Sequence, residues 1–121
     1  MKKTFSNEEM WAYVQLAARL HETGKLAYAI ARNTRKFKSE LTEYTAKRDE
    51  LLAKYGTPVS GKPGHYDLDS EARQQYEEEL KEYSTIETEV DIMQVTEDVF
   101  SGGNLTNTQM DALMWMVQEG E

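Results

Sequence analysis

The chain contains no cysteine among its 121 residues. Disulfides, thiolate nucleophiles and zinc sites with cysteine ligands are therefore excluded, and the composition fits a reducing compartment. No apolar run approaches the roughly 20 residues that a membrane span needs, and the first residues lack the apolar stretch of a secretory signal. We therefore expect no association with a membrane.

Basic residues are scarce in the second half of the chain. The sequence carries 14 Lys and Arg residues against 22 Asp and Glu residues, which gives a formal net charge of -8. Residues 1–56 hold 11 basic and 7 acidic side chains, whereas residues 57–121 hold 3 basic and 15 acidic ones. An anionic chain repels phosphate and releases no counterions from it, so direct nucleic-acid binding is not expected.

Capping signals and hydrophobic periodicity predict a single helical domain over residues 1–121. Ser6 with Glu9, and Thr106 with Gln109, form capping boxes that place helix starts at 7 and 107, and Asp69 is a good N-cap for a third start. The predicted segments are a helix over 7–23, a long helix over 26–55, a loop over 57–68, an acidic helix over 70–87 and a terminal helix over 107–118.

The long helix has the clearest pattern in the chain. Ile30, Phe37, Tyr44 and Leu51 recur every seven residues, which is typical of a coiled-coil seam. We expect an all-α or nearly all-α fold built on a long helical hairpin, with the first and last helices flanking it and short β pieces near 66–68 and 90–95. Because the acidic helix is shorter than the seam, the Ile30–Phe37 end must be covered by the first helix or by another chain. The overhang and the methionine-rich terminal helix together lead us to expect a dimer or a higher homo-oligomer.

The acidic segment over 67–98 allows two interpretations. Its side chains Glu71, Glu78, Glu82 and Glu89 are spaced by seven, four and seven residues, so they share one side of a helix. Packing beside the basic half of the chain would leave an ordinary solvated face, and this interpretation is favoured. The alternative is a surface that mimics nucleic-acid phosphates and binds a basic partner.

One basic cluster and one methionine-rich segment are further candidates for interaction. Pairing with the acidic half of the same or a neighbouring chain is favoured over nucleic-acid binding for the basic cluster, and core packing is favoured over a partner-binding surface for the terminal segment. The residues are Arg32, Arg35, Lys36 and Lys38 in the basic cluster, and Met110, Met114 and Trp115 in the terminal segment.

The sequence contains no complete catalytic, metal-binding or phosphate-binding motif. His21 has Lys25 where a zinc-binding helix needs a second histidine, and Ala72 occupies the turn position where a calcium loop needs glycine. No serine or threonine has a credible His and Asp set, and Gly102-Gly103 lacks the lysine of a phosphate loop. The sequence therefore predicts a protein that is not an enzyme and has no catalytic residues, metal or cofactor.

Several stretches look familiar when taken together. They are KRDELLAKYG at 47–56, GHYDL at 64–68, residues 77–82, TEVDI at 88–92 and residues 105–113. With these stretches, residues 24–117 resemble a family of small proteins of unknown function that phages and prophages of Gram-positive bacteria encode. The resemblance implies a place in the bacterial host cytoplasm or in a virion, and a phage or host protein as partner. It implies no catalytic residues.

Two functions of different classes follow from these expectations. The favoured one is a structural or assembly accessory of the phage that acts through helical surfaces. The alternative is an inhibitor of a host defence nuclease, similar in action to an anti-CRISPR protein, whose acidic helix occupies a nucleic-acid channel. An inhibitor should keep its carboxylates on one exposed face, whereas an accessory should use them beside the basic helix.

Overall fold

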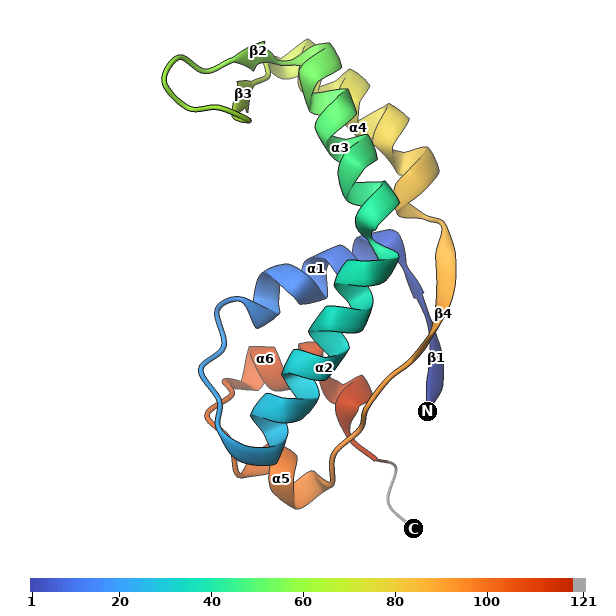
Figure 1. Ribbon diagram of the computed structural model, residues 1–121, viewed down its shortest axis with the longest axis vertical. Coiled ribbons are helices and arrows are strands. Elements are labelled where there is room, and N and C mark those ends of the chain that lie inside the picture. The colour runs from blue at the N-terminus through green and yellow to red at the C-terminus, as the bar shows by residue number, and fades with distance from the viewer. Residues whose placement is uncertain (119–121) are drawn as a thin grey trace.

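The computed structural model describes residues 1–118 (Figure 1). A body and a projecting arm are visible; the arm comprises the segment 42–84. The elements in chain order are β1 (Lys2–Ser6), α1 (Asn7–Ala17), α2 (Gly24–Glu40), α3 (Thr42–Tyr55), β2 (Thr57–Pro58), β3 (Tyr66–Asp67), α4 (Ser70–Ser84), β4 (Glu87–Asp91), α5 (Glu97–Ser101), α6 (Asn107–Ala112) and the 3-10 turn η1 (Met114–Met116).

Two small antiparallel sheets make the fold mixed α/β, so the predicted all-α fold with a long coiled-coil hairpin is wrong. The described chain is 60% helical. β1 pairs with β4, from Lys2 opposite Asp91 to Ser6 opposite Glu87, and β2 pairs with β3 at the tip of the arm. β3 and β4 overlap the short extended pieces expected at 66–68 and 90–95, whereas β1 and β2 were not expected.

The long helix predicted over 26–55 is divided in two at Leu41. The Leu41 backbone has φ -87° and ψ 0°, and the Thr42 hydroxyl donates to the carbonyl oxygens of Lys38 and Ser39, at 3.4 and 3.0 Å. A threonine hydroxyl that bonds back to the preceding turn bends a helix. α2 therefore belongs to the body and α3 to the arm (Figure 1).

The heptad stripe is buried as predicted, but against two different sets of partners. Ile30 and Phe37 pack inside the body, where Phe37 meets the ring of Tyr13 from α1. Tyr44 and Leu51 are also buried, and they lie on the part of the stripe where α3 packs against α4. One chain therefore covers the whole stripe, and the first helix covers the Ile30–Phe37 end, which was one of the two coverings expected. The homo-oligomer stays a prediction.

Two further predicted helices end early. The first was expected to reach residue 23, but α1 ends at Ala17 because the chain must reverse before α2, which packs back against α1 and begins at Gly24 with φ 65°. The acidic helix was expected to reach 87, but α4 ends at Ser84 and the chain turns into β4.

The terminal helix expected over 107–118 also ends early, at Ala112. Extended chain at Val95 competes for its last residues: the Val95 N–H donates to the Met116 carbonyl, and the Gln118 N–H donates to the Val95 carbonyl. The segment 114–116 therefore tightens into η1, and the described chain ends beside residue 95. All three predicted N-caps are confirmed, including the capping boxes at Ser6 and Thr106.

Four aromatic rings fill the centre of the body. Phe37 lies between Phe5 and Tyr13, with ring centroids 4.9 Å from each, and its ring is 5.6 Å from that of Trp115. Edge-to-face packing at these distances stabilises rings beyond the area they bury. β1, α1, α2 and η1 thus meet at one cluster, although each of its rings comes from a different part of the chain.

Burial of Tyr13 predicts a stability loss at high pH. Its hydroxyl donates to the Ile30 carbonyl at 2.9 Å, and burial raises the pKa of Tyr13 to about 12. The unfolded chain loses this proton near pH 10, so the stabilisation is complete below pH 10 and falls as the pH rises towards 12. We expect a loss of about 2 to 3 kcal/mol in unfolding free energy between pH 9 and 12. Denaturant titrations should show it in the wild type and much less in Tyr13→Phe; equal pH profiles would contradict it.

Within residues 1–118, none of the helices combines the length and the apolar character needed to cross a bilayer.

Candidate interaction surfaces

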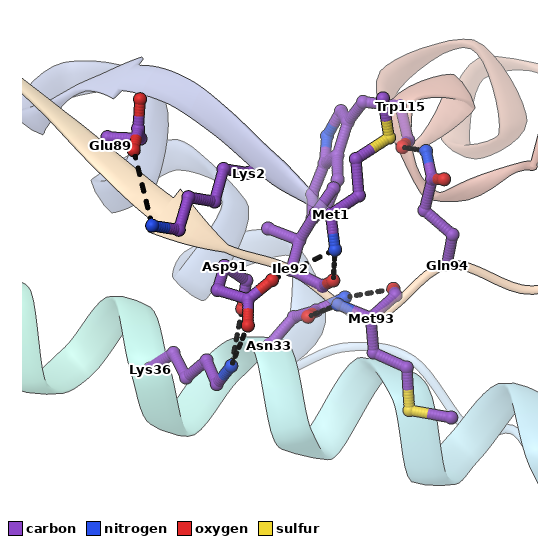
Figure 2. Close-up of polar contacts among 10 residues, drawn as sticks. All are labelled: Met1, Lys2, Asn33, Lys36, Glu89, Asp91, Ile92, Met93, Gln94 and Trp115. Carbon is purple, nitrogen blue, oxygen red and sulfur yellow. Dashed lines mark hydrogen bonds and ion pairs between the residues drawn. The ribbon is translucent and has the colours of Figure 1, made fainter.

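Two of the charged interaction candidates, Lys36 and Glu89, contact other residues at the β1–β4 sheet (Figure 2). Lys36 donates to the backbone carbonyl of Asp91, and its Nζ is 3.9 Å from the Asp91 carboxylate. The amino group of Met1 lies 2.9 Å from the same carboxylate, and this hydrogen bond lowers the pKa of Asp91 below its usual value. Glu89 lies 3.8 Å from Lys2 on the paired strand. Lys36 and Glu89 therefore act within the fold.

Asn33 on α2 holds the chain that follows β4. Its side-chain amide donates to the Met93 carbonyl at 3.0 Å and its oxygen accepts from the Met93 N–H at 2.8 Å (Figure 2). Asn33 is fully buried, so this pair of bonds fixes the extended segment on α2 without water. No periodic or motif signal points to Asn33, because the partner of this asparagine lies 60 residues away in the sequence.

The methionine-rich segment is divided between the core and the surface. Met116 and Leu113 are fully buried, and Met110 and Trp115 are half-buried. The Trp115 carbonyl accepts a hydrogen bond from Gln94 at 2.9 Å (Figure 2). Met114 is 55% exposed. Of the three candidates in this segment, only Met114 offers most of its side chain to a partner.

The arm carries the exposed carboxylates on α4. Glu71, Glu78 and Glu82 are exposed, and no ion pair within residues 1–118 involves them. We call these three residues the acidic face. Their neighbour Glu79 is different, because it meets Lys54 of α3 at 3.1 Å, and the hydrogen bond from Lys54 lowers the pKa of Glu79.

The basic cluster lies on α2 in the body, away from the acidic face. Arg32, Arg35 and Lys38 are exposed and form no ion pair within the described part of the chain. The expected charge pairing across the hairpin is therefore not made by these residues, because the helix break at Leu41 puts α3, and not α2, beside α4. On α3, Lys47 meets Glu50 at 3.5 Å and lies 5.0 Å from the ring centroid of Tyr83.

A groove between α1 and α2 was missed by sequence reasoning. The volume of this groove is about 650 Å³. A second groove of about 410 Å³, beside Trp11 and Leu41, shares Val14 and Lys38 with the first and so continues it. The first groove exists because α1 ends six residues earlier than its periodicity predicts, which leaves Leu20 and the wall of α2 partly uncovered.

No group of three or more His, Asp and Glu side chains within residues 1–118 is placed to hold a metal ion. Asp69 accepts a hydrogen bond from the Ala72 N–H at 2.8 Å as the N-cap of α4, so this acidic segment forms the helix start that was predicted there.

No family model, curated protein or solved structure matches the chain. The resemblance to small phage and prophage proteins therefore stays a prediction.

Proposed function

We propose that this protein is a non-enzymatic interaction protein of phage or prophage origin whose arm binds a basic protein surface. The observation that carries the proposal is the acidic face: Glu71, Glu78 and Glu82 are exposed on α4 and are not neutralised by ion pairs within residues 1–118. The alternative named from the sequence, an inhibitor that mimics nucleic acid, required this arrangement.

The shape and chemistry of α4 add two supports. The arm projects from the body, so a partner can reach α4 without contacting α2 (Figure 1). Tyr76 and Leu80 are buried, which leaves the outward side of α4 polar. A polar, negatively charged rod suits a groove lined with Lys and Arg side chains, and the groove of a host nuclease that otherwise holds nucleic acid is such a surface.

The assembly accessory is the second candidate. Its support is the exposure of Tyr28, Ile86 and Met114, which are each more than half exposed. A contact with a virion protein that covers these side chains would remove apolar surface from water. A homo-oligomer would use the same residues. The two candidates require different surfaces, so one set of variants separates them.

Charge reversal on the arm tests the proposal. The double variant Glu78→Lys with Glu82→Lys should weaken binding to a basic nucleic-acid enzyme by about 10-fold or more, because like charges would then face each other across the interface. The measurement is a pull-down from host lysate at low and high salt, with the partner identified by mass spectrometry and its affinity then measured with purified protein. Binding of the wild type should weaken steeply with salt.

A matched control is Glu40→Lys with Glu43→Lys, which changes the net charge equally at exposed positions outside α4. It should retain most of the affinity. Recovery of virion proteins by the wild type and by the α4 double variant alike would contradict the proposal and support the accessory.

A further inference from the structure

The groove between α1 and α2 has an apolar floor. Val14 and Ala17 line it from α1, Leu20 lines it from the loop after α1, and Ala27, Ile30 and Ala31 line it from α2. The alanines of α2 are small, so a partner can approach the helix backbone closely.

The two grooves together are long and narrow. The second groove continues past Val14 and Lys38, which line both, to Leu41 and Thr45. Within α2 the wall from Ala27 to Lys38 is about 17 Å long at 1.5 Å per residue, and Leu41 and Thr45 extend it beyond the helix break. A depression of this length suits an extended or helical segment better than a small molecule, which a closed pocket would surround on most sides.

Positive charge lies along one edge only. Arg35 and Lys38 line the first groove three residues apart on α2, and neither forms an ion pair within residues 1–118. The α1 edge presents Gln15 and Ala18, which are neutral. Glu22, at the end of the groove, is engaged, because its carboxylate accepts from the Asn104 N–H at 2.8 and 3.1 Å.

We propose that this groove binds an amphipathic helix of a partner protein, with its apolar stripe on the alanine-lined floor and acidic side chains along the flank that faces Arg35 and Lys38. Helix-in-groove binding buries apolar residues spaced by three, four and seven positions, and a charged flank sets the orientation. The charge of the edge specifies the acidic flank, and the length of the wall specifies three to four turns or more.

A second copy of the chain does not fit this description. Its acidic helix α4 has a suitable charge, but Tyr76 and Leu80 of that helix are buried in the arm, so its exposed side offers no apolar stripe. Nucleic acid does not fit either, since phosphates would gain nothing from the apolar floor. The inference goes beyond the proposed function, because the acidic face and the groove carry opposite charges on different helices.

A synthetic helix can test the groove without knowledge of the natural partner. The probe is a fluorescein-labelled 18-residue peptide with leucines spaced by three and four residues and glutamates along one flank; a second peptide has lysines in place of the glutamates. We expect the acidic peptide to bind with micromolar affinity by fluorescence anisotropy, and to shift the amide NMR signals of Ala27, Ala31 and Thr34.

Two variants alter the groove and one serves as a matched control. Ala31→Trp places a large side chain on the floor of the groove, and Arg35→Glu with Lys38→Glu reverses the charge of its edge. Each variant should lower the affinity for the acidic peptide at least 10-fold. Arg32→Glu changes the charge of the same helix outside the groove and should lower the affinity for the acidic peptide less than 3-fold. The reversed double variant should bind the lysine peptide instead, a gain that misfolding cannot produce.

The opposite outcomes would overturn the proposal. Binding of the acidic peptide that is unchanged in Ala31→Trp and in the reversed double variant would place it elsewhere. Self-association in sedimentation experiments that Ala31→Trp abolishes would identify a second copy as the occupant. The α4 double variant Glu78→Lys with Glu82→Lys should bind the acidic peptide at least as well as the wild type, so failure of the groove and failure of the acidic arm are distinguishable.

Discussion

Replacing Phe37 with alanine should lower the free energy of unfolding by about 4 kcal/mol. Phe37 is fully buried, and its ring contacts those of Phe5, Tyr13 and Trp115. Removing it takes away the transfer free energy of a phenyl group and leaves a cavity where four elements meet. The loss is comparable to the whole stability of a small domain, which is about 5 to 15 kcal/mol. Denaturant unfolding followed by circular dichroism measures it.

Two control variants keep this prediction testable if Phe37→Ala does not fold. Phe37→Leu should fold and lose less stability, because leucine refills part of the cavity. Tyr28→Ala removes an aromatic ring from the same helix at a position that is 55% exposed, and should change the unfolding free energy by less than about 1 kcal/mol. A Phe37→Ala protein with near wild-type stability would show that the cluster is not the centre of the core.

Replacing Asn33 with alanine should cost about 3 kcal/mol and lower the melting temperature by roughly 10 °C. The variant leaves the N–H and the carbonyl of Met93 without their partners, and both bonds run through a side chain with no solvent exposure. An orphaned buried polar group costs more than an ordinary hydrogen bond contributes. Thermal unfolding followed by circular dichroism provides the measurement.

Asn104→Ala is the matched control. Asn104 is exposed, and it is its backbone N–H that meets Glu22, so the substitution keeps that bond and should shift the melting temperature by no more than about 2 °C. Asn33→Asp keeps an acceptor for the Met93 N–H but places a buried carboxylate against the Met93 carbonyl, so at neutral pH it should be at least as destabilising as Asn33→Ala. If Asn33→Ala and Asn104→Ala have the same melting temperature, the two hydrogen bonds to Met93 are not what holds the segment after β4.

Local signals in the sequence predicted local structure well. Ser6 with Glu9, and Thr106 with Gln109, form the capping boxes that their residue types predict, since a capping box closes within four residues. The seven-residue repeat correctly predicted which side of the α2–α3 stretch is buried. It could not identify the partner, because Ile30 and Phe37 need any apolar neighbour and not specifically a second long helix.

Structure that depends on distant segments could not be predicted. β1 forms because β4, more than 80 residues away, supplies its hydrogen bonds, and nothing near Lys2 announces that pairing. The terminal helix shortens because Val95 competes for the backbone of Met116. The same contrast between local and distant determinants holds for the candidate surfaces. The exposure of Glu78 and Glu82 could be predicted from helix periodicity. The groove could not, because it depends on where α1 ends and on how α2 packs back against it.

The pairing of β1 with β4 also orders events during synthesis. The first strand is synthesised early, but its partner strand comprises residues 87–91 and the last ring of the aromatic cluster is Trp115, so neither the sheet nor the cluster can be completed until most of the chain is made. The arm has no such delay, because α3 and α4 are separated only by the short β2–β3 segment. Closing a loop of about 80 residues costs roughly 1.5 kcal/mol more than closing one of about 15. We therefore expect the contacts between α3 and α4 to form before the body of the protein is complete.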